Sequence, residues 1–200
     1  KTYTLTEPQG LEVAELTEEK VNVSCYGQET GVFAAAINRT SAGPYKYELK
    51  NEAGDLIDAS PFTTETKWFF TNLPAEKYVI TISDANDCFK EIDNLEITQP
   101  LTGLQIDEVS ISSFNGFNIS CSEAADGWIE VITSGGSGNN IYKWTGPENF
   151  SADTPSITNL VPGDYHLTIV DQNGCEALTE IINLIEPKPL LINSEVGINN

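Results

Sequence analysis

The chain has 200 residues and a net charge of −20, from 30 acidic against 10 basic side chains. Such a surface repels phosphate backbones and anionic lipid, so neither nucleic-acid binding nor direct membrane insertion is expected. With 40% hydrophobic and 9% aromatic residues the composition is that of a globular protein, and no apolar run is long enough to cross a bilayer.

Two copies of one pattern make up the sequence. Residues 10–16 (GLEVAEL) return as residues 103–109 (GLQIDEV), and residues 73–88 return in similar form as residues 160–175. A repeat of about 90 residues indicates two tandem domains, each of a size that can fold alone.

A short proline-containing marker separates the copies. It occurs at residues 4–8 (TLTEP), 97–100 (ITQP) and 185–187 (IEP), and the start of another copy follows each time. We therefore expect the chain to be a piece of a longer array. The predicted limits are the end of a preceding repeat at 1–8, a first repeat at 9–100, a second at 101–187 and the start of a following repeat at 188–200.

Short strands fill both copies. Val21, Val23 and Cys25 alternate with polar residues, which predicts a strand with one buried face, and the turns are rich in glycine and asparagine. The first copy is expected to have seven strands, at residues 11–16, 20–25, 31–37, 45–49, 67–70, 78–83 and 88–97. This number of strands in this length predicts an all-β fold of two tandem immunoglobulin-like antiparallel β-sandwich domains.

Each copy has two cysteines at matching positions. Cys25 and Cys121 end an early strand, whereas Cys88 and Cys175 directly follow a late turn. Zinc is not indicated because there is no Cys-x-x-Cys motif and only one histidine; free buried thiols are the alternative. Repeat symmetry predicts one disulfide per domain, Cys25–Cys88 and Cys121–Cys175, and hence an oxidising compartment.

A tyrosine opens a late strand in both copies, just after a proline-containing turn. The hydroxyls of Tyr78 and Tyr165 are placed to reach back to the backbone of the preceding corner, as in a tyrosine corner. The second copy has Gly163 in this turn where the first has Glu76. The first turn is therefore expected to depend less on a positive φ.

A series of short motifs occurs in the same order in both copies. The first copy has Val23-Ser-Cys25-Tyr-Gly27, Gly31, Pro44-Tyr-Lys-Tyr47, Asn72-Leu-Pro-Ala75, Tyr78, Asp84-Ala-Asn-Asp-Cys88 and Ile97-Thr-Gln-Pro100. The second has Ile119-Ser-Cys121, Asp126-Gly127, Gly135-Gly136, Tyr142-Lys-Trp144, Asn159-Leu-Val-Pro-Gly163, Tyr165, Asp171-Gln-Asn-Gly-Cys175 and Glu186-Pro187. This series resembles the SprB-type repeat of cell-surface adhesins of the Bacteroidota.

The resemblance implies an extracellular immunoglobulin-like or PKD-like repeat, exported by the type IX secretion system, in a protein of gliding motility or surface attachment. The first copy departs from the pattern at three positions. Asp87 replaces the usual turn glycine, Thr30 replaces the usual aspartate, and Leu49 replaces the tryptophan seen at Trp144.

Catalytic motifs are not found in this sequence. The one histidine, His166, lies between Tyr165 and Leu167, so it is expected on the solvent face of its strand and not in a catalytic triad. The glycine-rich stretch at residues 135–138 lacks both the pattern of a nucleophile elbow and the lysine of a phosphate-binding loop. We predict that the chain is not an enzyme and requires no cofactor.

Calcium is the one ion for which candidate ligands exist. In an immunoglobulin strand order, the turn after the Val-Ser-Cys strand and the turn that carries Asp-x-Asn are expected at the same end of the sandwich. Glu123, Asp126, Asp171 and Asn173 would then converge and offer the hard oxygen ligands that calcium prefers. The alternative is a simple hairpin turn, in which Asp and Asn bind their own backbone.

The predicted function is that of a structural stalk repeat in a large, secreted cell-surface adhesin. Neighbouring repeats of the same chain are the expected partners. The alternatives are a carbohydrate- or protein-binding module, for which Trp68, Trp128 and Trp144 offer aromatic faces, and an accessory repeat of a secreted hydrolase. Core packing is the competing interpretation of the tryptophans.

Overall fold

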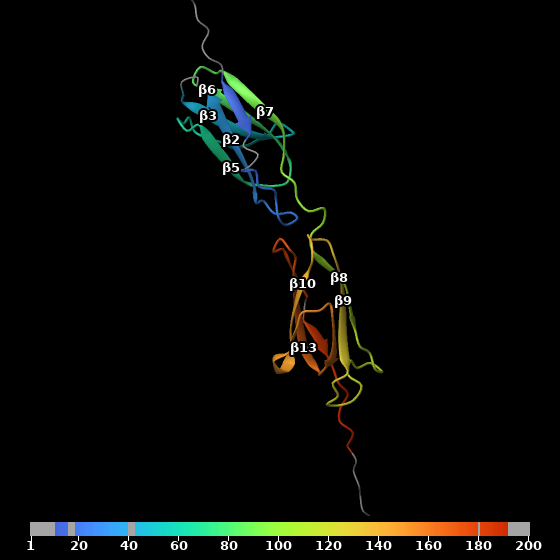
Figure 1. Ribbon diagram of the computed structural model, residues 1–200. Coiled ribbons are helices and arrows are strands. Elements are labelled where there is room, and N and C mark those ends of the chain that lie inside the picture. Colours follow the sequence, from blue (N-terminus) through green and yellow to red (C-terminus); the bar gives the residue numbers. More distant parts are fainter. Residues whose placement is uncertain (1–10, 16–18, 40–42, 180, 192–200) are drawn as a thin grey trace, which may run out of the picture. The chain divides into compact units, whose positions relative to one another are not determined.

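The computed structural model describes residues 11–15, 19–39, 43–179 and 181–191, and Figure 1 labels their main strands. The chain forms two compact units, Lys1–Leu101 and Thr102–Asn200, where the sequence placed the boundary between residues 100 and 101. The predicted segment 1–8 lies outside the described residues, and of segment 188–200 only residues 188–191 are described. No helix in the described ranges is long and apolar enough to span a membrane.

The first unit is a sandwich of two antiparallel sheets. One sheet has the order β1-β2-β5 and the other the order β4-β3-β6-β7. The strands are β1 (Glu12–Glu15), β2 (Gly31–Arg39), β3 (Tyr45–Asn51), β4 (Leu56–Ala59), β5 (Lys67–Leu73), β6 (Lys77–Asp84) and β7 (Phe89–Glu96). This is the order of an immunoglobulin-type sandwich whose fourth short strand pairs with the sheet of the late strands.

Alternating side chains from both sheets form the core of the first unit. In β6 every second residue is buried, including Tyr78, Ile80 and Ile82, because successive side chains of a strand point to opposite faces. Phe33 of β2 packs edge-on against Tyr78, with 5.7 Å between the ring centroids. The sequence pattern in this strand therefore predicted its buried face correctly.

The second unit repeats this architecture. One sheet has the order β8-β9-β12, and the other the order β11-β10-β13-β14, with β15 also paired to β13. The strands are β8 (Gln105–Ile111), β9 (Gly127–Ser134), β10 (Ile141–Thr145), β11 (Ser151–Ala152), β12 (Ser156–Leu160), β13 (Gly163–Val170), β14 (Glu176–Leu178) and β15 (Ile182–Leu184). The all-β fold of two immunoglobulin-like antiparallel sandwiches agrees with the sequence prediction.

The predicted strand at residues 20–25 is not a regular strand. Val21 forms an isolated bridge with Val32 of the first sheet, whereas the Val23 amide donates to the carbonyl of Thr98, which follows the last strand of the second sheet. This segment therefore crosses from one sheet to the other. Because it crosses, only Val23 is buried, and Val21 is 47% exposed.

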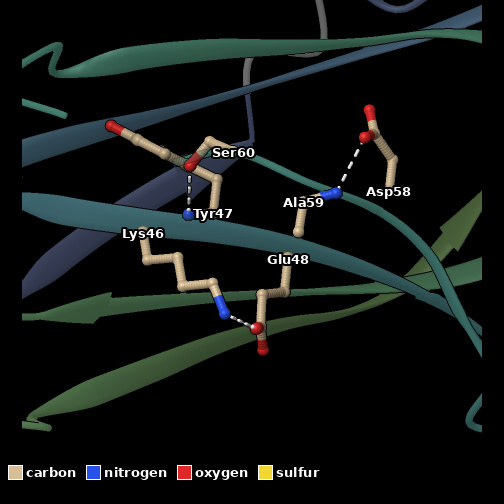
Figure 2. Close-up of polar contacts among 6 residues, drawn as sticks. All are labelled: Lys46, Tyr47, Glu48, Asp58, Ala59 and Ser60. Carbon is tan, nitrogen blue, oxygen red and sulfur yellow. Dashed lines mark hydrogen bonds and ion pairs between the residues drawn. The ribbon is translucent and has the colours of Figure 1, made fainter. Parts of the chain in front are cut away.

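Strand β4 was not predicted, because its short sequence has exposed apolar residues and no alternation. The chain after it is fixed to β3: the Tyr47 amide donates to the buried Ser60 Oγ at 2.9 Å, and Figure 2 shows this contact. On the same strand, Lys46 and Glu48 form an ion pair. The Ser60 contacts continue the pairing of β3 with the chain beyond the end of β4.

Candidate functional site

The polypeptide enters and leaves the second unit at opposite ends of the sandwich. Near the entry, the carbonyl of Thr102 accepts a hydrogen bond from the amide of Gly136. At the exit, residues 185 and 186 lie beside the segment that precedes β9. A pull on the two ends of this unit therefore acts roughly along the strands.

Four hydrogen bonds join the exit segment to an earlier segment in the second unit. The amides of Asn118 and Ile119 both donate to the carbonyl of Ile185, at 2.8 and 3.1 Å. In return the Ile185 amide donates to Asn118 Oδ1 at 3.0 Å, and the Glu123 amide donates to Glu186 Oε2 at 2.6 Å. We call these contacts the clamp of the second unit.

The first unit has the same clamp at the matching positions. The Val23 amide donates to the carbonyl of Thr98 at 2.9 Å, and the Thr98 amide donates to Asn22 Oδ1 at 3.1 Å. The Gly27 amide donates to Gln99 Oε1 at 2.7 Å. Asn22 and Gln99 thus do in the first unit what Asn118 and Glu186 do in the second.

Both segments of each clamp run in the same direction. In the second unit residue 119 is hydrogen-bonded to residue 185 and residue 123 to residue 186, so residue numbers increase in the same direction along both segments. When the two chain ends of a unit are pulled apart, such a pair is loaded in shear. The hydrogen bonds must then break together, which opposes unfolding more strongly than breaking them one at a time.

Asn118 is held in place by a second set of contacts. Its Nδ2 donates to the carbonyl of Ser112 at 2.9 Å, and the buried Ser112 hydroxyl donates back to the Asn118 carbonyl at 2.7 Å. The same hydroxyl oxygen accepts the amide of Trp128, which lies in β9. The asparagine therefore links three parts of the unit, and its side chain is oriented before it meets Ile185.

A glycine at the start of the strand beside each clamp allows this close packing. A Cβ at Gly127 would lie 2.7 Å from Ile119 Cδ1 and 3.0 Å from the carbonyl oxygen of Leu160. A Cβ at Gly31 would lie 2.7 Å from the carbonyl oxygen of Leu73 and 2.8 Å from Ile97 Cγ2. At Gly31 the backbone oxygen leaves no room for a Cβ, so only glycine fits there, whereas a Cβ at Gly127 would require the Ile119 side chain to move.

The predicted calcium ligands are not brought together. The Asp171 and Asn173 turn lies at the entry end of the second unit, where Asp171 Oδ2 accepts the amide of Ser137. Glu123 and Asp126 lie at the exit end, where Asp126 Oδ1 accepts the amide of Ser120. The expectation that both turns share one end was wrong, because the Ile119-Ser-Cys121 segment, which precedes β9, runs along the last strand toward the exit.

Asp171 instead closes its own turn. Its carboxylate is buried and Oδ1 accepts the amides of Asn173 and Cys175, at 2.9 and 2.8 Å. Asp84 does the same in the first unit with Asn86 and Cys88. Across the described ranges no group of three or more His, Cys, Asp or Glu side chains is placed to hold a metal ion.

Hydrogen bonds near the exit lower the pKa of Asp126, one of the predicted calcium ligands. Contacts with Ser120 hold the pKa of the exposed Asp126 below its usual value. This carboxylate therefore supports the turn that contains Cys121. We call this turn, residues 120–124, and its equivalent in the first unit, residues 24–27, the Ser-Cys turns. The turn that contains the other cysteine of each unit is called the Asp-Asn turn (residues 84–88 and 171–175).

Neither predicted disulfide is formed, because Cys88 and Cys121 are free, exposed thiols. The Ser-Cys turn of the first unit lies beside residues 97–99, and the Asp-Asn turn lies at the other end of β6 and β7. With eight residues in β6, the two ends are about 25 Å apart, whereas bonded cysteines have Cα atoms within roughly 7 Å. The second unit has the same arrangement, so each predicted pair spans the length of a sandwich.

The tyrosine corners are present in both units. Tyr78 Oη donates to the carbonyl of Pro74 at 2.9 Å, and Tyr165 Oη donates to that of Val161 at 3.0 Å. Burial, together with the carboxylates of Glu76 and Glu29, raises the pKa of Tyr78 to about 12. Burial also raises the pKa of Tyr165.

The tryptophans and the histidine have separate roles. Trp144 is fully buried and its Nε1 donates to the carbonyl of Thr154 at 2.9 Å, while Trp68 stacks on Tyr47. Trp128 is 37% exposed and lines a shallow hollow of about 230 Å³. His166 is exposed, as predicted.

Comparison with known families gives one match, in the second unit. Residues 117–149 match the family model of the SprB repeat. The matched segment of the SprB repeat contains Asn118, Cys121, Gly127 and Trp144, so it includes half of the second clamp. It confirms the resemblance seen in the sequence, and no curated protein sequence matches the chain.

Solved structures of several proteins match the chain at low sequence identity. A C-terminal fragment of intimin, in complex with the intimin-binding domain of the translocated intimin receptor, has 14% identity and a TM-score of 0.44 over 90% of this chain and 64% of that fragment. The BSP domain of a biofilm-associated protein has 16% identity and a TM-score of 0.30, over 88% of this chain and 29% of its own. A two-domain fibronectin type-III segment of chicken tenascin has 13% identity and a TM-score of 0.30, over 90% and 99%. This chain thus spans less than two thirds of the first two structures.

The clamp was missed in the sequence. Its asparagine occurs twice in the same setting, as Asn22 and Asn118, each three residues before a cysteine, and its second half is the Gln-Pro or Glu-Pro marker. The repetition was visible, but the partners are 76 and 67 residues apart, so the sequence did not show that they meet.

Proposed function

We propose that this chain is a force-bearing segment of the stalk of an extracellular surface adhesin that acts in cell attachment or gliding motility. The observation that carries the proposal is the clamp, which occurs at the same positions of both units and joins the exit segment to the interior of its own sandwich. The SprB-repeat match supports a place at the cell surface. Export by the type IX system belongs to the same proposal.

The mechanism is mechanical and requires no cofactor or catalysis. Tension that reaches a unit through its two ends is carried by the clamp hydrogen bonds and by the core beneath them. Ile119 of the second unit and Val23 of the first are buried beside their clamps, so each clamp is anchored to the core of its own sandwich. The resistance to unfolding under force depends on the rate of crossing the unfolding barrier.

Single-molecule pulling in a reducing buffer, in which disulfides carry no tension, tests the proposal. An Asn118→Ala variant loses the Ile185 and Ser112 contacts, so the unfolding force of one of the two units should fall while the other keeps its value. Asn22→Ala should in the same way lower the unfolding force of the first unit. The exposed Asn139 of the second unit gives a matched control, Asn139→Ala, which should leave both events unchanged. Unchanged forces in both clamp variants would contradict the proposal.

Glycan binding is a second candidate function, favoured by the surroundings of Trp128. The exposed part of this indole faces the hollow that Glu130, Ser156 and Thr158 also line, so an apolar face lies next to hydrogen-bonding groups. Titration with bacterial polysaccharides, followed by tryptophan fluorescence, tests it. A saturable change that is lost in Trp128→Ala would support binding, and no change would exclude it for the glycans used.

A further inference from the structure

Two exposed cysteines with free thiols lie in turns of different kinds. Cys88 is in the Asp-Asn turn of the first unit, at the end of the sandwich where β6 passes into β7. Cys121 is in the Ser-Cys turn of the second unit, next to the exit segment. Both side chains are exposed. Neither can reach the other cysteine of its own repeat, because that residue lies at the far end of the sandwich.

The equivalent residues of the other repeat show that both positions accept a cross-link. Cys25 is the repeat equivalent of Cys121, and Cys175 is the repeat equivalent of Cys88. Both Cys25 and Cys175 are disulfide-bonded. A Ser-Cys turn and an Asp-Asn turn can therefore each hold an oxidised cysteine without loss of the local hydrogen bonds that close them.

We propose that Cys121 and Cys88 form disulfides with other repeats, in which the cysteine of a Ser-Cys turn bonds to the cysteine of an Asp-Asn turn. For this chain the partner is a second copy, joined head to tail through Cys121 of one molecule and Cys88 of the other. In an array the same bond would join the chain to the repeats on either side.

The surface beside Cys121 fits such a partner. A hollow of about 520 Å³ is lined by the Ser-Cys turn and by residues 187–190, where two prolines and Leu190 supply apolar surface. Leu190 is 97% exposed. On the other side, Phe89 directly follows Cys88 and is 62% exposed, so the hollow can receive its ring when the two sulfurs meet.

Charge also favours the pairing of unlike turns. Lys188 lines the hollow beside Cys121, and Asp87 is exposed in the turn that carries Cys88. Two Asp-Asn turns would instead bring together two copies of Asp87 without this lysine. Because the whole chain has a charge of −20, copies repel each other, and a covalent bond is a suitable way to keep them joined.

The oxidation is a thiol–disulfide exchange with a small disulfide such as oxidised glutathione. One protein thiolate attacks the small disulfide, forms a mixed disulfide and releases one reduced thiol. The second protein thiolate then attacks the protein sulfur of the mixed disulfide and releases the second reduced thiol. Two protein thiols lose two protons and two electrons, and one molecule of the small disulfide is reduced.

Non-reducing electrophoresis of the chain in a glutathione redox buffer tests the proposal. The unaltered chain should give a ladder of head-to-tail oligomers, and peptide mapping should find the Cys88–Cys121 link. Cys88→Ser and Cys121→Ser should each stay monomeric alone, and an equimolar mixture of the two should give dimers only. Dimers of either variant alone, or no ladder from the unaltered chain, would overturn the proposal.

A charge variant separates a specific contact from random oxidation. Lys188→Glu should slow ladder formation severalfold at low salt while its melting temperature stays that of the unaltered chain. An unchanged rate would overturn the docking of the two turns. The cross-link does not depend on the clamp, so loss of the ladder would leave the pulling experiment as an independent test of the stalk function.

Discussion

Tyr165 Oη donates a 3.0 Å hydrogen bond to the backbone carbonyl of Val161, four residues earlier. The bond fixes the corner between β12 and β13 just where the chain crosses from one sheet to the other. Tyr78 and Pro74 form the same corner in the first unit. Since each ring is also buried in its core, the corner joins the turn to the packing of the sandwich.

Removal of the corner hydroxyl should destabilise the second unit. Tyr165→Phe keeps the ring in the core but leaves the Val161 carbonyl without this donor, which costs about 1 kcal/mol. Thermal unfolding should show a melting temperature roughly 4 to 8 °C lower for that unit. Tyr26→Phe, in which an exposed ring loses its hydroxyl, is the control and should change nothing. Equal melting temperatures for all three proteins would contradict the role of the corner.

The first unit should lose stability at alkaline pH. The pKa of Tyr78 is about 12 in the folded chain against an ordinary 10.0, so folding favours the protonated hydroxyl. Its contribution is therefore complete below pH 10 and is lost as the pH rises toward 12. The difference in unfolding free energy between the unaltered chain and Tyr78→Phe should shrink across this range. A difference that stays constant with pH would rule out this linkage.

Asp171 should matter for its own turn and not for calcium. Asp171→Ala removes the acceptor of three backbone amides, at residues 137, 173 and 175, and should cost about 2 to 3 kcal/mol. Asp153→Ala, at an exposed position, is the matched control. Because both oxygens of Asp171 already accept amides, we expect calcium and chelator to leave the melting temperature unchanged. A calcium-dependent rise that disappears in Asp171→Ala would contradict this prediction.

Two glycines of the second unit should respond differently to substitution. Gly163 has a φ of 140°, and a Cβ there would lie 2.5 Å from Pro147 Cγ. Gly163→Ala should therefore cost about 2 to 4 kcal/mol from strain and overlap together. Gly174→Ala meets open space at a φ of 81° and should cost only about 1 kcal/mol.

A third variant completes this comparison. Gly174→Asp should cost less than Gly174→Ala, since Asp87 occupies the same turn position of the first unit with a φ of 61°. Short polar side chains adopt the left-handed conformation more readily than alanine. Chemical unfolding of the three variants would give the order directly, and a Gly174→Asp protein less stable than Gly174→Ala would contradict it.

The sequence determined what depends on local pattern and on repetition. The alternation of Tyr78, Ile80 and Ile82 was enough to identify β6 and its buried face, because neighbouring side chains of any strand point to opposite sides. The hydrogen bond from Tyr165 to a carbonyl four residues earlier could also be predicted, because both groups lie in one short segment. The repeat itself followed from the match of one half of the chain to the other.

Only the tertiary structure decided which residues meet across a unit. Cys25 and Cys88 have matching equivalents in the second repeat, yet they lie at opposite ends of their sandwich, and so do Asp126 and Asp171. The sequence spacing is the same whether a segment crosses between sheets or stays in one, so it could not place the Ser-Cys turn at the exit. Asn118 meets Ile185 across 67 residues because two sheets pack face to face and bring the crossing segment beside the last strand. That packing, and not the pattern of any one strand, creates the clamp.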